Sequence, residues 1–229
     1  MAAVAVAHRG DPYRVRENTL PSLRSALRRG ADAVEIDARL TRDGVPVLLH
    51  DATLERLWEH ELRLADITAP ELRELTGGGV PTLRAGLAAI CETPAARAMI
   101  DLPDAAAAPA TVAEVRTFGA EERAYYCGGA NAMLAVRARD PHAEIALTWT
   151  TLAPPRPSLL AAVRPRWLNY RFGLLGTDLV DRLHADGLLV SAWTADTRRT
   201  MRRLLRSGVD SITTNRIDTL RGLLDATAP

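Results

Sequence analysis

The chain has no lysine, so arginine supplies all 29 of its basic residues, against 28 acidic ones. The formal net charge of +1 differs from the basic excess usual in nucleic-acid-binding proteins, and we expect no nucleic-acid partner. Only two cysteines are present, Cys91 and Cys127, and they lack the CxxC spacing of metal or redox motifs. The composition therefore excludes a disulfide scaffold and a cysteine-based metal site.

Long apolar runs are also absent. No stretch approaches the roughly 20 residues that span a bilayer, so we expect no stable membrane insertion. The apolar start of the chain is short, has no basic residue before it and ends at His8 and Arg9, unlike a signal peptide. We therefore expect a cytoplasmic protein. Its 229 residues, 47% of them hydrophobic, suffice for one α/β barrel or two small domains.

Short apolar strands alternate with amphipathic helical stretches through most of the chain. We expect eight main strands, at residues 4–8, 33–37, 98–102, 124–127, 144–148, 167–170, 188–193 and 210–213. We expect helices at residues 19–29, 110–117, 130–139, 178–185, 197–206 and 218–225. After the second strand come an extended piece at 45–50 and a short irregular insertion at 51–80.

Eight strands that alternate with helices predict a TIM (β/α)8 barrel, a single domain over residues 1–229. A doubly wound open sheet would show the same alternation. That alternative often carries a glycine-rich phosphate loop, and the sequence contains neither GxGxxG nor GxxxxGKS/T. The barrel is therefore the fold that we predict.

Five ionisable side chains stand at the ends of predicted strands: His8, Glu35, Asp37, His50 and Asp101. In barrel enzymes the active site is built at the carboxyl ends of the strands. Charged groups at several such ends are difficult to explain as filling for a hydrophobic core. These residues are therefore our candidates for an active site.

The Glu35-Ile36-Asp37 tripeptide predicts a cation site. Side chains alternate along a strand, so Glu35 and Asp37 face the same side and their carboxylates repel each other. A hard divalent cation such as Mg²⁺ or Ca²⁺ takes oxygen ligands of this kind. The pattern alone fits two solvated acids at a strand end equally well.

Histidines near these acids predict proton transfer. His8 and His50 could act as a base and an acid in a displacement at phosphorus. The guanidinium of Arg9 could hold two phosphate oxygens. Taken singly, each of the three is also compatible with a structural histidine or a surface ion pair.

In combination these residues resemble the glycerophosphodiester phosphodiesterase family, as a divergent bacterial member, over nearly the whole chain. The resemblance rests on His8-Arg9-Gly10, Glu17-Asn18-Thr19-Leu20, Glu35-Ile36-Asp37, residues 44–47, 50–56 and 80–83, Ala192-Trp193-Thr194 and residues 208–215. Any one of these motifs is weak, but their order along the chain makes a chance match improbable.

The resemblance implies a TIM barrel that binds one divalent cation, Mg²⁺ or Ca²⁺. Its ligands would be Glu35, Asp37 and Asp101, and the acid/base pair would be His8 and His50. Such an enzyme is a phosphoric diester hydrolase of lipid metabolism. It cleaves small glycerophosphodiesters to glycerol 3-phosphate and an alcohol.

The resemblance also implies substrate contacts. Arg9 would bind the phosphate, Glu17 would lie beside the site, and Trp193 would form a pocket wall or, equally, a core aromatic. The family usually has a lysine two residues after the third-strand acid, and Pro103 stands there instead. Arg171 could supply the missing cation, although it could also be an ordinary surface arginine.

Alternative functions remain open at this stage. A lysophospholipase D or a cyclising phospholipase on the same fold would need an apolar groove, which Leu54, Leu57, Trp58 and Leu62 could line. A non-catalytic binder of glycerophosphodiesters could have lost turnover together with the lysine. An amidohydrolase-like barrel is disfavoured, because it usually has His-x-His after the first strand. The sequence indicates neither the head group of the substrate nor the oligomeric state.

Overall fold

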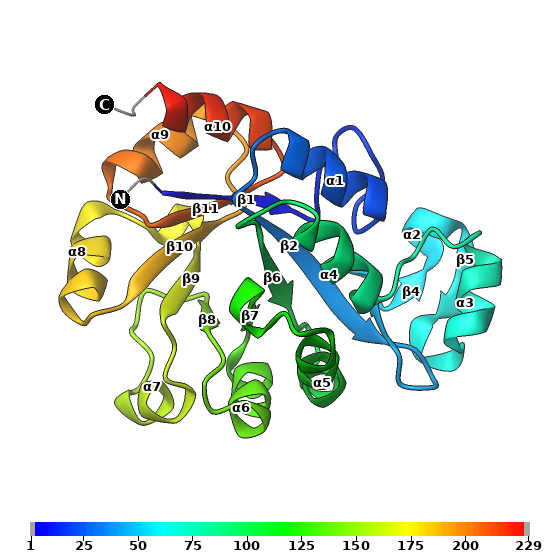
Figure 1. Ribbon diagram of the computed structural model, residues 1–229. Helices are drawn as coiled ribbons and strands as arrows, with labels where there is room; N and C mark the ends of the chain where they lie inside the picture. Colours follow the sequence, from blue (N-terminus) through cyan, green and yellow to red (C-terminus); the bar gives the residue numbers. More distant parts are fainter. Residues whose placement is uncertain (1–2, 227–229) are drawn as a thin grey trace.

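The computed structural model describes residues 3–226, and these form a closed barrel of eight parallel strands (Figure 1). In chain order the strands are β1 (Val4–His8), β2 (Ala33–Leu40), β6 (Arg97–Asp101), β7 (Ala124–Gly128), β8 (Ile145–Trp149), β9 (Trp167–Arg171), β10 (Leu189–Trp193) and β11 (Ser211–Thr214). The sheet closes because β1 pairs with β2 on one side and with β11 on the other. The predicted TIM barrel is confirmed.

Helices surround the barrel, as Figure 1 shows. They are α1 (Leu20–Arg28), α4 (Leu83–Cys91), α5 (Ala108–Phe118), α6 (Ala130–Arg139), α7 (Pro157–Val163), α8 (Thr177–Ala185), α9 (Arg198–Arg206) and α10 (Ile217–Asp225). Three short 3₁₀ turns lie between them: η2 (Ala105–Ala107), η3 (Glu121–Arg123) and η4 (Phe172–Leu174). The main hydrophobic core lies between the strands and these helices.

Strand β2 shows how the sequence positions the site. Val34 and Ile36 are fully buried in the main core, so Glu35 and Asp37 face the barrel interior, as the alternation predicts. The strand runs to Leu40, beyond its predicted end, because residues 38–40 pair antiparallel with β3 (Pro46–Leu48). This pairing makes the extended piece after β2 part of the sheet.

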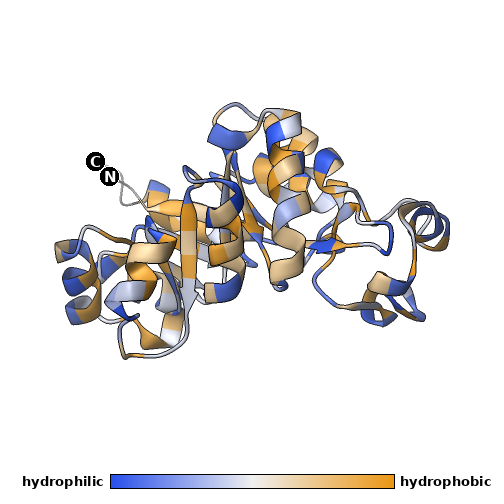
Figure 2. Cartoon of the chain, turned by 90° about the horizontal axis from the view of Figure 1, so that it is seen from below, coloured by the Kyte–Doolittle hydropathy of each residue, from blue (hydrophilic) through white to orange (hydrophobic). Residues whose placement is uncertain are grey.

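Residues 51–80 project from the barrel as a separate lobe, seen at the right of Figure 2. The lobe contains β4 (Thr53–Leu54), α2 (Glu55–Trp58), β5 (His60–Arg63), η1 (Leu64–Asp66) and α3 (Ala69–Leu75). Leu54 is fully buried in the small core of this lobe, and Trp58 packs against that core. These side chains therefore hold the lobe together.

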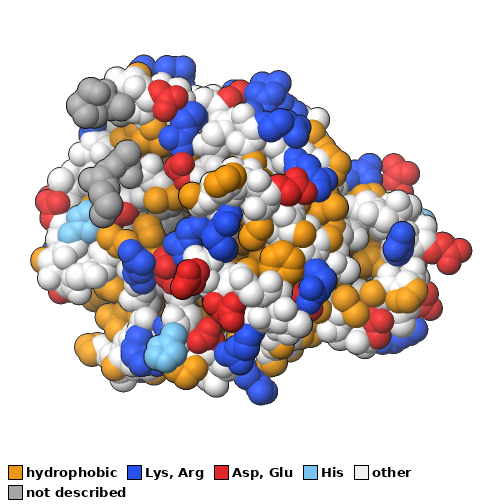
Figure 3. Space-filling model, viewed as in Figure 1, with side chains coloured by type: hydrophobic (Ala, Val, Ile, Leu, Met, Phe, Trp, Pro, Cys, Tyr) orange, Lys and Arg blue, Asp and Glu red, His pale blue; other side chains and the backbone are white. Residues whose placement is uncertain are grey.

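One face of the molecule shows the balanced composition at its surface. On the face shown in Figure 3, basic and acidic side chains are interspersed over most of the area. Within residues 3–226, no helix is long and apolar enough to cross a membrane.

Candidate active site

A cavity of about 310 Å³ opens at the carboxyl ends of the barrel strands. Seven of the residues predicted from the sequence line it: His8, Arg9, Glu35, Asp37, His50, Asp101 and Trp193. Glu17 and Arg171 lie outside this lining. The fold thus brings together residues that are up to 185 positions apart in the chain, and it does so where barrel enzymes build their sites.

Three carboxylates form the centre of this cavity. One oxygen from each of Glu35, Asp37 and Asp101 lies within 4.8 Å of the others. Strands β2 and β6 are neighbours in register, with Asp37 opposite Asp101. Burial, together with the charges of the other two acids, raises the pKa of Glu35 well above its usual value. Burial and the charge of Asp37 raise the pKa of Asp101 to about 6.

Burial and the charges of the neighbouring acids thus both disfavour the ionised forms of Glu35 and Asp101. Arg9 compensates in part, because its Nε lies 3.2 Å from an oxygen of Asp37. Three carboxylates beside one guanidinium leave an excess of negative charge at the centre of the cavity. This donor set fits a hard divalent cation.

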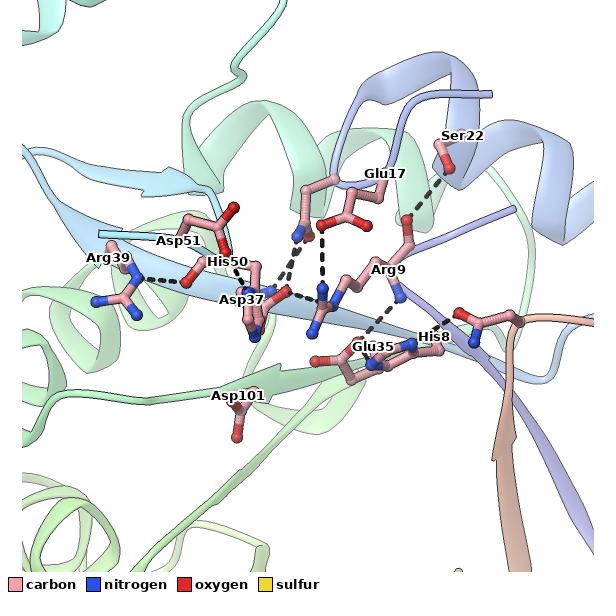
Figure 4. A network of polar contacts seen from close by, with 12 residues as sticks. His8, Arg9, Glu17, Ser22, Glu35, Asp37, Arg39, His50, Asp51 and Asp101 are labelled. Carbon is pink, nitrogen blue, oxygen red and sulfur yellow. Dashed lines mark hydrogen bonds and ion pairs between the residues drawn. The ribbon is translucent and has the colours of Figure 1, made fainter. Parts of the chain in front are cut away.

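Arg9 is held by its backbone and by its side chain. Its backbone N–H donates to Glu35 Oε2 at 2.9 Å, and its Nη1 donates to Glu17 Oε1 at 3.0 Å. The backbone turns tightly here, with φ values of 55° at Arg9 and 90° at Gly10. A Cβ at Gly10 would lie 2.7 Å from the Ser22 backbone, so glycine is required. Figure 4 shows Arg9 between Glu17 and the acids.

His8 has a defined tautomer. Its Nδ1 lies 2.8 Å from Oδ1 of Asn215, whose backbone N and Nδ2 both donate to Asp196. Since the Asp196 carboxylate only accepts, Asn215 must present its oxygen to His8, and Nδ1 carries the hydrogen. Nε2 lies 4.0 Å from Glu35. Burial and the charge of Arg9 lower the pKa of His8, which favours a neutral ring.

Two neighbouring residues, Asp51 and Arg39, orient His50. Its Nδ1 lies 2.7 Å from Asp51 Oδ1, and its backbone oxygen accepts from Arg39 Nε at 2.7 Å. Burial alone would raise the pKa of Asp51, but hydrogen bonds from Arg56 and His50 lower it. The Nδ1 hydrogen therefore points at a charged carboxylate, which leaves Nε2 for the cavity (Figure 4).

Several residues that position the site were not identified from the sequence. Asn18 donates to Asp37 Oδ2 at 2.7 Å and accepts from the backbone N–H of Asp37. Arg56 in α2 donates to Asp51 Oδ2 at 2.5 Å and to Glu17 Oε1 at 2.6 Å. Both residues lie within motifs on which the family resemblance rests. Their place in those motifs is the only feature of the sequence that could have identified them.

Pro103, which stands at the position where the family usually has lysine, lines the cavity. Arg171 is exposed at the end of β9, with its guanidinium carbon 6.0 Å from the ring centre of Trp193. It has no ion-pair partner among residues 3–226. Trp193 lines the cavity and donates from Nε1 to the backbone oxygen of Asn169 at 3.3 Å.

Comparison with solved structures supports the fold. A putative glycerophosphoryl diester phosphodiesterase from Silicibacter pomeroyi superposes with a TM-score of 0.86 at 23% identity, over 98% of this chain and 94% of that one. A phosphodiesterase from Oleispira antarctica, solved in complex with the product sn-glycerol-3-phosphate, has a TM-score of 0.84 at 22% identity, over 98% and 97% of the two chains.

Comparison of sequences shows the family. The chain is 27% identical to a glycerophosphodiester phosphodiesterase of Caldanaerobacter subterraneus, over 98% of both chains. It is 29% identical to a probable glycerophosphodiester phosphodiesterase 2 of Mycobacterium tuberculosis, over 97% of this chain and 91% of that one. Residues 8–219 match the profile of the glycerophosphoryl diester phosphodiesterase family. The chain therefore belongs to that family of hydrolases.

Proposed function

We propose that this protein hydrolyses glycerophosphodiesters to glycerol 3-phosphate and an alcohol, in a reaction that depends on a divalent metal. The observation that carries the proposal is the convergence of three carboxylates and two imidazoles on one cavity. The names of the full-length relatives agree with it, as does the product bound to the Oleispira antarctica enzyme.

Glu35, Asp37 and Asp101 would hold one cation, either Mg²⁺ or Ca²⁺. After the charge of Arg9 is counted, a divalent ion would balance the remaining charge of the three acids. When bound, such an ion polarises a phosphoryl oxygen and lowers the pKa of an oxygen nucleophile.

The two histidines would divide the proton transfers. The surroundings of His8 favour a neutral ring whose Nδ1–H donates to Asn215. Its Nε2 would therefore accept the proton of the attacking hydroxyl or water. His50 is held by Asp51 through Nδ1, and in its protonated form, with a hydrogen on each ring nitrogen, its Nε2 would donate a proton to the departing alcohol oxygen. This assignment follows from the partners of the two rings.

Arginines would hold the phosphate. Arg9 lines the cavity and is fixed by Glu17, so its guanidinium would bind a phosphate oxygen beside the acids. Arg171 would reach over Trp193, which forms the pocket wall, and would replace the cation that Pro103 cannot provide. Its long side chain and its position at a strand end support this role.

The experiment is a substrate panel with the purified protein. Glycerophosphocholine and lysophosphatidylcholine are assayed with EDTA and after addition of each cation. We expect cation-dependent release of glycerol 3-phosphate from glycerophosphocholine and little turnover of the lysolipid. The reason is that Leu54 and Trp58 pack in the core of the lobe rather than along the cavity. Binding of glycerophosphodiesters without any product would contradict the proposal.

A further inference from the structure

A cavity of about 320 Å³, separate from the candidate active site, lies at the amino ends of β7 and β8. Its walls come from the last turn of α5, from η3 and from the turn between α6 and β8. Because the barrel strands are parallel, this end of the barrel is opposite the end where the three acids meet. Small-molecule sites usually have volumes of roughly 300–1,000 Å³, so this amino-end pocket is large enough for a ligand of its own.

Acidic side chains dominate the charge of the amino-end pocket. Glu121, Glu122 and Asp140 line it, and none of them has an ion-pair partner among residues 3–226. A fourth acid of the lining, Glu144, is already paired with two arginines, at 2.9 and 3.3 Å. Arg116 brings the one arginine charge of the lining. With histidine counted as neutral, the three unpaired carboxylates therefore exceed the positive charge by two.

Tyr126 adds an unused hydroxyl to this pocket. The residue is only 3% exposed and packs in the main core, and its phenol end reaches the pocket lining. Its hydroxyl makes no hydrogen bond within the described part of the chain. Burial, together with the charges of Asp140 and Glu121, raises the pKa of Tyr126, so the group stays a neutral phenol. Buried hydroxyls normally have a partner, and here a ligand in the pocket can supply it.

The chemistry of the lining restricts the ligand. Carboxylates only accept hydrogen bonds, and the phenol oxygen can accept one more, so the ligand should be positively charged and carry several N–H donors. A single metal ion fits less well. Within residues 3–226, the only three acids close enough to share one ion are Glu35, Asp37 and Asp101. Two excess charges spread over a pocket of this size therefore match an extended organic dication.

We propose that the amino-end pocket binds a short aliphatic diamine in its doubly protonated form. One ammonium group would donate to the hydroxyl of Tyr126 and pair with Asp140, and the other would pair with the glutamates of η3. The two cavities have no lining residue in common, so the inference does not depend on the proposed function.

Isothermal titration calorimetry of the native chain with 1,4-diaminobutane at neutral pH and low salt tests the proposal. We expect saturable binding at one site in each chain. Tetramethylammonium has a positive charge but no N–H donor, and it should bind at least about tenfold more weakly. Absence of binding by the diamine, or equal affinity for the two ligands, would overturn the proposal.

Variants locate the site. Tyr126→Phe removes only the hydroxyl and should lower the affinity for the diamine about tenfold, without lowering the melting temperature, because that hydroxyl has no partner in the chain. Asp140→Asn should also lower the affinity about tenfold. The matched control is Tyr170→Phe, which removes another buried hydroxyl without a partner among the described residues, on β9 and outside this pocket. The control should bind the diamine as the native chain does.

The variants also identify the results that would overturn the site. These are an unchanged affinity in either Tyr126→Phe or Asp140→Asn, or an equal loss in Tyr170→Phe. Binding that disappears in Asp37→Asn but persists in both pocket variants would place the diamine at the catalytic acids, and would overturn the proposal as well.

Discussion

Replacing Arg56 with methionine should lower kcat/KM for glycerophosphocholine about tenfold while leaving the fold intact. Arg56 joins the carboxylate that orients His50 to the carboxylate that holds Arg9, at 2.5 Å from Asp51 and 2.6 Å from Glu17. Its side chain is 48% exposed, so solvent screens both contacts. At roughly 0.2–1 kcal/mol for each exposed pair, the two together contribute about 0.4–2 kcal/mol, and a loss of about 1.4 kcal/mol within that range corresponds to tenfold in rate.

The assay is steady-state kinetics across pH at saturating cation, with thermal unfolding measured in parallel. Arg73→Met is the matched control, because Arg73 is an exposed arginine of the same lobe with no ion-pair partner among the described residues. Arg56→Lys should restore only part of the activity, since an ammonium group does not reproduce the fork that spans two carboxylates. Arg56→Met with the native kcat/KM, or Arg73→Met with an equal loss, would refute the reasoning.

The geometry also leads to predictions about the two histidines, Arg171 and Asp101. His8→Ala and His50→Ala should each lower kcat by about 10²–10⁴, measured by product release, and full activity in both would contradict the assigned roles. Arg171→Ala should raise KM for glycerophosphocholine several-fold, whereas unchanged KM and kcat would show that this arginine does not reach the phosphate. Because the pKa of Asp101 is raised to about 6, protons should compete with the cation, and calorimetry should find about tenfold weaker cation binding at pH 5 than at pH 7. The raised folded-state pKa also means that ionisation of Asp101 destabilises the metal-free protein as the pH rises from about 4 through 6. Added cation should offset this contribution, and a melting temperature at pH 7 that cation does not raise would contradict it.

Local patterns in the sequence predicted the barrel and the acidic centre well. The alternation in Glu35-Ile36-Asp37 placed both carboxylates on the inner face, and the structure agrees. His8 and Asp101 stood at predicted strand ends, and the barrel brings those ends to one cavity. These predictions succeeded because strand periodicity and barrel topology together fix where a side chain points.

Other elements could not be predicted from local patterns. The lobe is built from elements as short as the two-residue strand β4 and the four-residue helix α2, which hold too few repeats to show a period. Helix α4 contains Gly86, a poor helix former, where a Cβ would lie 2.6 Å from a side-chain carbon of Leu48. Here close packing against β3 decides the residue type, and only the tertiary structure shows it.

The partners of the catalytic candidates were equally hidden. Asn215 orients His8 from 207 positions away, and Asn169 lines the same cavity from β9. No spacing rule connects such pairs, because they meet only when the sheet closes.

The most direct test is whether turnover depends on a bound divalent cation that EDTA removes. The purified chain is treated with EDTA, assayed on glycerophosphocholine, and assayed again after Mg²⁺ or Ca²⁺ is restored, with Asp37→Asn measured beside it. We predict that EDTA abolishes release of glycerol 3-phosphate, that one of the two cations restores it, and that Asp37→Asn stays inactive with either. A rate that EDTA does not change would contradict the claim that the three carboxylates hold a catalytic cation.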